Sequence, residues 1–342
     1  MSPQGNAGER APASITRGRA TNRRGRWAAR FQAYSVGGAA VLLVVIVSIG
    51  NPAFLSPTNI SNMLSQWAPA GIMAVGMTAV IIAGGFDLSI SAGFSFAAVV
   101  AAMIGQHAYS MVALAGAIAA GVLVGAANAL LISGFKINPF ITTVGTGFVV
   151  NGVALLVTRN AAFIVSDPAF GTLGEGHWHD IPYSGVLLIA IIAVFGIILS
   201  RTIYGHAIYA VGGNPEASRL SGIRVDAVVS STYIFLGGCV GLAGFISASE
   251  LNSAQANIDP RILFDVLTIV IVGGTSLGGG VGSIGRTIVG LVIIATITNG
   301  FVLLDVSPFY QDVIKGLIII GALVLDSVLR RVGARPRATP SE

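Results

Sequence analysis

Charged residues are scarce in this sequence. Asp, Glu, Lys and Arg make up only 10% of the 342 residues, whereas apolar residues make up 54%. Soluble domains carry about 25% charged residues. A surface that faces water cannot be built from so few charges, so most of the surface must face lipid. The composition therefore excludes an ordinary soluble domain and indicates a membrane protein.

Lysine is rarer still, and its scarcity excludes one way of using ATP. The two lysines, Lys136 and Lys315, are followed by Ile137 and Gly316. A P-loop needs G-x-x-x-x-G-K-[ST], in which lysine and backbone N–H groups hold the phosphates. Neither lysine fits this pattern. We therefore predict that the chain is not an enzyme and that any ATP-driven step uses a separate ATPase.

Cysteine and histidine are also few. The single cysteine, Cys239, excludes an intrachain disulfide and a C-x-x-C metal site. The pair His177 and His179 has no further Cys or His nearby in the sequence, and H-E-x-x-H is absent. We therefore expect neither a metal nor a cofactor.

Arginine, by contrast, gathers at the two ends of the chain. Such clusters are typical either of nucleic-acid binding or of the cytoplasmic side of a membrane protein. We favour the second interpretation and expect no nucleic-acid partner. The sequence then predicts a disordered cytoplasmic tail over 1–30, a membrane domain over 31–330 and a cytoplasmic tail over 331–342. The clustered residues are Arg10, Arg17, Arg19, Arg23, Arg24, Arg26 and Arg30, then Arg330, Arg331, Arg335 and Arg337.

A membrane-spanning helix needs about 20 mostly apolar residues. The sequence predicts an all-α polytopic protein with about ten such helices, at 32–50, 67–84, 91–109, 110–133, 139–158, 184–201, 227–249, 263–275, 284–304 and 310–329. An even number places both tails on the same side of the membrane, which the arginine clusters indicate is the cytoplasm. Five basic residues then also fall in cytoplasmic loops, namely Lys136, Arg201, Arg219, Arg224 and Arg286.

Two segments of the sequence resemble each other. Residues 78–89 and 268–278 each contain an apolar run that ends in a pair of glycines. The second leads into the glycine-rich stretch 273–280, so we expect one or two interrupted helices. Irregular backbone at membrane depth survives only where it is buried in protein or lines a wet cavity. Repeated halves with interrupted helices are typical of transporters, although a chance likeness is the alternative.

Asp87 follows the first glycine pair. An ionisable group near the membrane is costly unless it meets water, a partner or a helix end. In one interpretation Asp87 and Ser89 cap the third span and, with Phe86, shape a translocation pathway. In the other, Asp87 sits in an ordinary cytoplasmic turn.

The loop between the sixth and seventh spans predicts a short capped helix. Asn214 followed by Pro215 is typical of an N-cap and first helical residue, Glu216 suits the positive end of the helix dipole, and Gly222 suits the C-terminal cap. This helix either docks onto a soluble partner or connects two spans along the membrane surface. The docking interpretation covers Gly212, Gly213, Asn214, Glu216, Arg219 and Gly222.

Residues 274–278 match G-x-S-x-G, the nucleophile turn of serine hydrolases. Such a serine needs a histidine base. In the predicted topology none of the four histidines lies beside Ser276, so an intramembrane serine hydrolase is a remote alternative. The histidines are His107, His177, His179 and His206.

Several stretches together resemble the ribose-type permeases of ABC importers, in the larger group of branched-chain amino acid and sugar permeases. They are 73–78 running into 85–89, 212–223, 251–255 and 272–279. The resemblance covers about residues 35–328 in order. Several motifs at fixed spacing are more specific than any one of them alone.

The resemblance implies a permease subunit that imports a small sugar or sugar-like solute by alternating access. It implies a pore of two permease subunits, identical or closely related, and an extracytoplasmic solute-binding protein. It also implies a cytoplasmic ABC ATPase that binds at 212–222. A permease of the same architecture for a nucleoside, a quorum-signalling sugar derivative or a branched-chain amino acid is the alternative.

Residues at the glycine-rich breaks and polar residues on the spans are candidates to line the pathway. Each polar candidate also suits a helix–helix hydrogen bond, which is the alternative. The candidates are Phe86, Asp87, Ser89, Asn151, Thr275, Ser276 and Asn299.

Overall fold

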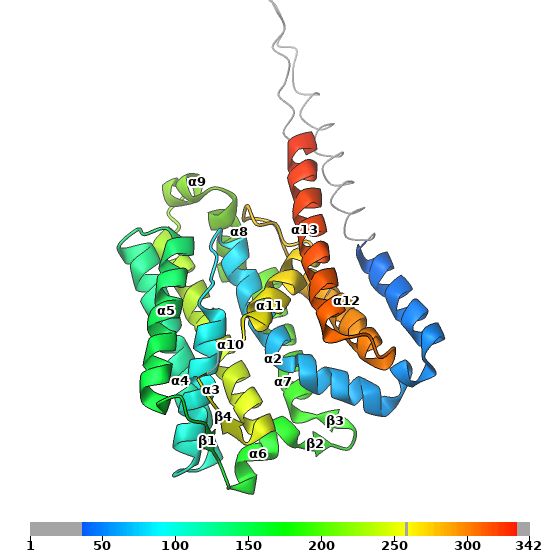
Figure 1. The fold of residues 1–342 in the computed structure, drawn as a ribbon. Helices are drawn as coiled ribbons and strands as arrows, with labels where there is room; N and C mark the ends of the chain where they lie inside the picture. Colours follow the sequence, from blue (N-terminus) through cyan, green and yellow to red (C-terminus); the bar gives the residue numbers. More distant parts are fainter. Residues whose placement is uncertain (1–35, 257–258, 334–342) are drawn as a thin grey trace, which may run out of the picture.

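The computed structural model describes residues 36–256 and 259–333, and helices make up most of it (Figure 1). This agrees with the predicted all-α fold. The tails predicted for 1–30 and 331–342 lie outside the described residues, except that the last helix continues to Gly333.

The elements follow one another with short connections. After the helix Val36–Gly50 come η1 (Pro52–Leu55), α2 (Pro57–Ile82), α3 (Ile90–Gly105), α4 (Ser110–Ala129), the π-helical turn η2 (Leu130–Gly134), α5 (Pro139–Thr158), β1 (Phe163–Ile164), α6 (Pro168–Glu175), β2 (His177–Trp178), β3 (Ile181–Pro182), α7 (Tyr183–Arg201), α8 (Ile203–Gly213), α9 (Pro215–Leu220), α10 (Val225–Leu251), β4 (Ser253–Ala254), α11 (Pro260–Val272), α12 (Ile284–Leu303) and α13 (Pro308–Gly333). Strand β1 pairs with β4, and β2 pairs with β3, both antiparallel.

Several helices begin with the same two-residue signal. A polar side chain accepts a hydrogen bond from a backbone N–H of the first turn, and proline follows it at the first helical position. Ser56 and Pro57 start α2 in this way, ten residues before the predicted start at 67. The same signal recurs at Asn138–Pro139, Asp167–Pro168, Asn214–Pro215 and Asp259–Pro260.

Among the described residues, six helices are long and apolar enough to cross a membrane. They are α2, the continuous helix Ser110–Gly134, α5, α7, α10 and α12. The helices Val36–Gly50 and α3 are apolar but shorter. The chain is therefore a multi-pass membrane protein.

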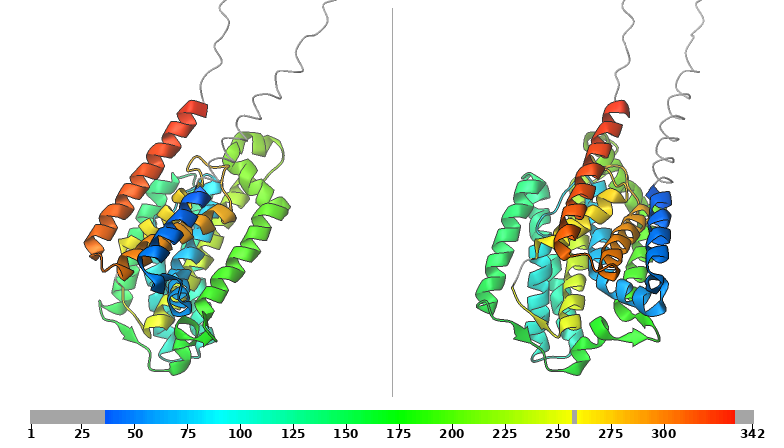
Figure 2. Two further views of the ribbon diagram at one scale, coloured as in Figure 1. Left: turned by 90° about the vertical axis from the view of Figure 1, so that its right-hand side faces the viewer. Right: turned by 45° about the vertical axis from the view of Figure 1, so that its right-hand side comes forward.

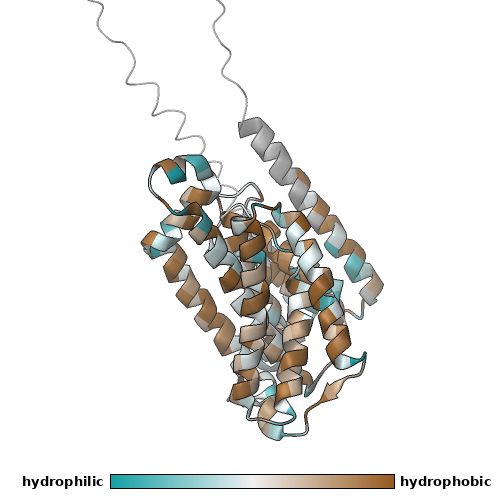
Figure 3. Cartoon of the chain, turned by 90° about the vertical axis from the view of Figure 1, so that its left-hand side faces the viewer, coloured by the Kyte–Doolittle hydropathy of each residue, from teal (hydrophilic) through white to brown (hydrophobic). Residues whose placement is uncertain are grey.

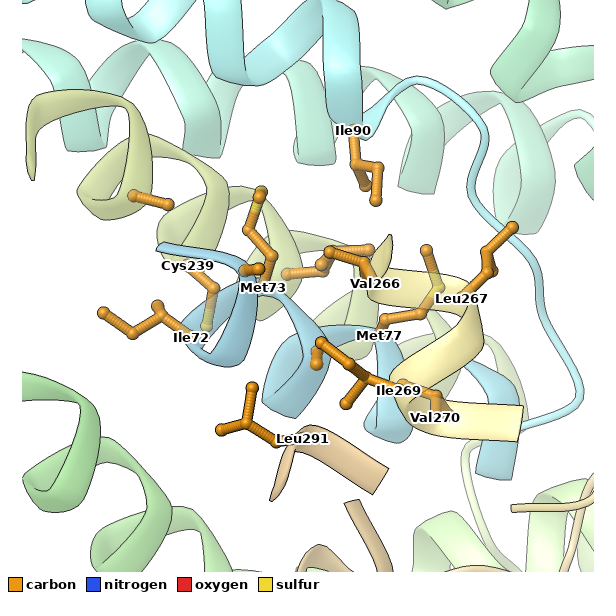
Figure 4. Packing of buried hydrophobic residues seen from close by; sticks show 14 of the residues in the cluster. Ile72, Met73, Met77, Ile90, Cys239, Val266, Leu267, Ile269, Val270 and Leu291 are labelled. Atoms are coloured by element: carbon orange, nitrogen blue, oxygen red, sulfur yellow. The ribbon is translucent and has the colours of Figure 1, made fainter. Parts of the chain in front are cut away.

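Helix α2 lies at the centre of the bundle. Its Ile72, Met73 and Met77 pack with Val266, Ile269 and Val270 of α11 and with Leu291 of α12 (Figure 4). Helices α7 and α10 also contact α2. Close contact of small residues joins α4 to α10: a Cβ at Gly121 would collide with the Gly237 carbonyl oxygen, as expected for glycines that bring membrane helices together.

The two ends of the bundle differ. One end, called here the α9 end, carries α8, α9 and the loop 273–283, and the other, the α6 end, carries α6 and the strand pairs (Figure 1). Hydrophilic residues gather in the connections at the ends, and the helices between them are largely hydrophobic (Figure 3). An exposed ion pair between Lys136 and Asp226 joins the connection before α5 to the first turn of α10 at the α9 end.

Helix α13 lies on the outside of the bundle with α11 as its neighbour, and its C-terminal part projects past the α9 end (Figure 2). Helix α11 is short and ends at Val272, so the predicted half-helix followed by irregular backbone is confirmed.

Candidate functional site

The two glycine pairs end their helices in the same way. Gly84 and Gly274 have φ of +86° and +94°, the left-handed region that glycine adopts readily. The N–H of Gly84 donates to Ile81 O (3.0 Å), and that of Gly274 donates to Ile271 O (2.9 Å). The residue that follows, Gly85 in the first break and Thr275 in the second, donates its N–H to the preceding turn, at Val80 O and Val270 O, so both ends are Schellman caps. The structures of these two helix ends therefore match, as their sequences do.

The end of α2 and the loop after α11 both contact the end of α8 through backbone atoms. We call this contact the glycine junction, and it comprises Gly84, Gly212, Gly279 and Gly280. The Gly280 N–H donates to Ile82 O at 2.8 Å. A Cβ on Gly212 would collide with that same Ile82 oxygen. The last turn of α8 therefore touches the break after α2 and the loop after α11 at one point.

Further bonds tie α8 and α12 to the loop 273–283. The Tyr209 hydroxyl donates to Gly282 O at 2.9 Å. The Arg286 guanidinium donates to Gly274 O at 3.1 Å. Burial raises the pKa of the Tyr209 phenol, although nearby Arg286 opposes that rise. The phenol therefore stays protonated and remains a donor at neutral pH.

The predicted capped helix is present as α9. The Ala217 N–H donates to Asn214 Oδ1 at 3.0 Å, and the Arg219 guanidinium donates to Glu216 Oε1 at 2.9 Å. Gly222 has φ of +83°, and the Ile223 N–H closes the C-terminal cap on Ser218 O. Gly212 and Gly213 belong to the last turn of α8, which leads directly into this helix.

Leu220 at the end of α9, which is not among the residues predicted from the sequence, is 90% exposed. An exposed leucine alone carries no argument. This one projects from a short, capped helix whose Glu216 and Arg219 are also exposed. The face combines an apolar side chain with two opposite charges.

The segment 83–89 crosses from α2 to α3 as irregular backbone and is held from three sides. The Phe86 N–H donates to the Tyr233 hydroxyl, which donates back to Phe86 O, both at 3.1 Å. The Leu88 N–H donates to Thr143 Oγ1 at 3.0 Å. Tyr233 lies on α10 and Thr143 on α5, so distant helices position the break.

Asp87 is buried within this segment, so its carboxylate does not lie in an exposed turn. Its Oδ1 accepts from the Ser89 N–H (2.7 Å) and the Ser89 hydroxyl (2.6 Å), and its Oδ2 accepts from Asn128 Nδ2 (3.1 Å). The predicted cap is wrong in detail. Ser89 occupies the N-cap position of α3, but its side chain bonds Asp87 instead of the first turn.

The structure does not bring the remaining pathway candidates together with Asp87. Asn299 on α12 forms a two-way amide pair with Asn59 on α2, at 2.9 and 3.0 Å. Thr275 is buried, and within the described residues its hydroxyl has no hydrogen-bond partner. Ser276 donates its N–H to Val281 O at 2.9 Å inside the loop 273–283. Asn151 lies half-buried on α5.

The histidines give Ser276 little support as a nucleophile. His177 and His179 lie at the α6 end, opposite the loop that holds Ser276. His206 lies on α8, is exposed, and has its Nδ1 2.7 Å from Thr202 O.

A polar hollow of about 430 Å³ lies at the α6 end, where the sequence predicted no site. It is formed where the first turns of α2 meet α6 and the end of α10, three segments far apart in the chain. Nothing in the sequence places them together. Its lining includes Asn62, Ser65, Gln66, Glu175, His177 and Glu250.

A ribose import permease protein of Bacillus subtilis (strain 168) is 40% identical over 288 residues, which cover 83% of this chain and 89% of that protein. The ribose import permease protein of Escherichia coli (strain K12) is 34% identical over 84% of this chain and 92% of its own length.

An L-arabinose ABC transporter permease protein of Azospirillum brasilense is 33% identical over 85% of this chain and 86% of its own length. No solved structure matches. The family described as "Branched-chain amino acid transport system / permease component" matches residues 59–323. This match covers most of the chain, and the chain therefore belongs to this family of permease components.

Proposed function

We propose that the chain is the membrane-spanning permease subunit of an ABC importer that moves a small sugar or sugar-like solute into the cytoplasm by alternating access. Relatives named for ribose and L-arabinose import support the solute class. ATP is hydrolysed by a separate subunit, in keeping with the lack of a P-loop in the sequence.

The proposed topology has ten crossings of the bacterial inner membrane. In chain order they are the helix Val36–Gly50, α2, α3, α4, α5, α7, α10, α11, α12 and α13. An even number puts both termini on one side. The α9 end is taken as cytoplasmic because Lys136, Arg201, Arg219, Arg224 and Arg286 all lie there, and basic residues accumulate on that side.

The glycine junction is the observation that carries the mechanism. An ATPase that binds α9 moves α8, because Asn214 alone separates the two helices. Gly212 of α8 in turn touches both helix breaks. Motion of the ATPase therefore reaches both halves of the bundle by backbone contact, and the interrupted helices switch the pathway between its two faces.

Two further partners complete the proposal. A second permease subunit, a copy or a close paralogue, forms the other half of the pore. A solute-binding protein delivers solute to the α6 end, where the polar hollow of about 430 Å³ offers carboxylates and amides to hydroxyl groups.

Uptake of labelled solutes tests the proposed function. Cells that lack the gene should lose uptake of ribose or L-arabinose, and re-expression should restore it. A nucleoside and leucine serve as comparison solutes for the alternative permeases. Equal sugar uptake with and without the gene, together with loss of leucine uptake, would contradict a sugar importer and favour an amino-acid permease.

A further inference from the structure

The connections at the α6 end are acidic. Within the described residues, those that join the spanning helices at this end hold one arginine and five acids. Orientation in the membrane depends on where Lys and Arg lie, and Asp and Glu contribute little to it. The orientation of the chain therefore does not account for these acids. The arginine is Arg159, and the acids are Asp167, Glu175, Asp180, Asp259 and Asp305.

Two carboxylates face the polar hollow at this end. Glu175 is the last residue of α6, and Glu250 lies in the last turn of α10. They are close enough to repel each other, and like charges that share a site are unfavourable. Among the described residues, no lysine or arginine lines the hollow and no cation pairs with either carboxylate. The hollow therefore holds two negative charges that its own lining does not neutralise.

The segments that carry these carboxylates are fixed to each other. The Gly174 N–H donates to Ser249 Oγ at 2.9 Å, and a Cβ on Gly174 would collide with the backbone nitrogen of Glu250. Asn252 Nδ2 donates to Glu175 Oε1 at 2.6 Å. The end of α6 is thus packed directly on the end of α10. A partner that binds there loses little free energy to reorganisation of the permease.

A basic side chain suits this site better than a metal ion. Within the described residues, no group of three or more His, Cys, Asp or Glu could hold a metal. A lysine or arginine side chain would relieve the repulsion and donate charge-assisted hydrogen bonds to the carboxylate oxygens. The volume of about 430 Å³ lies in the range of pockets that hold whole small ligands, so one side chain has room.

The position of the hollow selects the protein that supplies this side chain. The hollow lies at the opposite end of the bundle from α9, the proposed docking site of the ATPase (Figure 1). In the proposed topology this end faces away from the cytoplasm, where the solute-binding protein arrives.

We propose that Glu175 and Glu250 receive a basic side chain of the solute-binding protein, which docks on the α6 end through a basic face. This inference rests on the proposed function and names the charge by which the permease recognises that partner. The α2 wall of the hollow, with Asn62, Ser65 and Gln66, is uncharged and stays available to the hydroxyl groups of the solute.

The double variant Glu175→Gln with Glu250→Gln tests the proposal, because it removes both charges and nearly keeps the size of the side chains. The probe is the binding protein that supports sugar uptake by the wild-type permease, added to the permease–ATPase complex in nanodiscs. Its dissociation constant should rise about thirtyfold or more, the low end for a charge pair broken at an interface. Added salt should also weaken its binding less than it does for wild type. An unchanged dissociation constant would overturn the proposal.

Asp180→Asn is the matched control for the single variant Glu250→Gln. Asp180 is an exposed acid in the turn between β2 and β3 at the same end, outside the lining of the hollow. Each variant removes one charge. Glu250→Gln should weaken binding about tenfold, whereas Asp180→Asn should change it by no more than about twofold, as for an exposed surface charge. An equal loss with both would assign docking to the general charge of this end and would overturn the role of the hollow.

A charge exchange separates direct contact from damage to the fold. Glu250→Lys should abolish docking while leaving membrane level and ATPase capture at the opposite end unchanged. One Lys-to-Glu or Arg-to-Glu change on the surface of the binding protein should then restore docking to Glu250→Lys. If no single change of this kind restores it, the proposed contact is wrong.

Two other outcomes have different meanings. If the carboxylates bind solute and not the binding protein, the double Gln variant lowers uptake but binds the binding protein as wild type does, with and without sugar, which would overturn this inference alone. If the wild-type permease imports no sugar and binds no sugar-binding protein, the proposed function fails and this inference fails with it.

Discussion

The Asp87 carboxylate accepts three hydrogen bonds in a site almost closed to solvent. The donors come from Ser89 on the same segment and from Asn128 on α4, so this one side chain fixes the break after α2 against another helix. A cavity of only about 10 Å³ adjoins it, room for about one water molecule. Asp87 therefore holds the backbone of the segment 83–89 in place, and there is no space beside its carboxylate for a sugar.

Asp87→Ala should destabilise the protein, because it leaves the Ser89 N–H and one of the two Asn128 amide N–H groups without an acceptor, while the other still donates to the Ser89 hydroxyl. Each buried group left unpaired costs about 1–3 kcal/mol. A lower melting temperature of the detergent-purified protein would show this. The exchange Asp87→Asn with Asn128→Asp keeps one carboxylate and one amide in contact and should recover most of the loss. Equal stability of Asp87→Ala and wild type would contradict the assignment.

At the scale of elements, α9 is the proposed docking site for the ATPase. Leu220→Asp should weaken capture of the ATPase by roughly 10- to 100-fold, since truncating a central interface residue costs about 1–3 kcal/mol. Leu220 is 90% exposed, so the permease itself should fold normally. Co-purification with the tagged ATPase measures the effect.

Leu251→Asp is the control for this variant. Leu251 is also exposed, at 68%, but it ends α10 at the α6 end. ATPase capture should be unchanged by it. Undiminished capture with Leu220→Asp, or an equal loss with both variants, would contradict docking at α9.

Elements whose signals are local were predictable from the sequence. The capped helix α9 follows from Asn214, Pro215 and Gly222, and the break after α11 follows from its glycine pair. The start of α2 was missed because residues 57–66 are too polar to resemble a span, although Ser56 and Pro57 carry the cap signal.

Contacts between distant segments were not predictable. Asn128, Thr143 and Tyr233 hold the segment 83–89, yet each lies on a different helix, and their own surroundings in the sequence are ordinary. The pairing of Asp265 with Lys315 likewise depends on how α13 packs against α11. Only the folded chain shows which polar residues meet.

At the scale of the whole molecule, the two similar helix breaks, after α2 and after α11, lie near α8 and α9 at the α9 end. The glycine junction has no side chains to absorb a displacement, because backbone meets backbone there. A small movement of α8 must therefore shift the ends of α2 and of the loop after α11 together. In the proposed function, ATP hydrolysis is coupled to transport through this contact.

Gly212→Ala tests this coupling most directly, with Gly213→Ala as its control. A Cβ on Gly212 collides with the Ile82 carbonyl oxygen, whereas one on Gly213 meets nothing within 4 Å. Both variants should assemble with the ATPase and hydrolyse ATP in liposomes. Solute moved per ATP should fall about tenfold or more for Gly212→Ala, within the usual range of coupling free energies, and stay at the wild-type level for Gly213→Ala. Wild-type transport per ATP in Gly212→Ala would contradict the account.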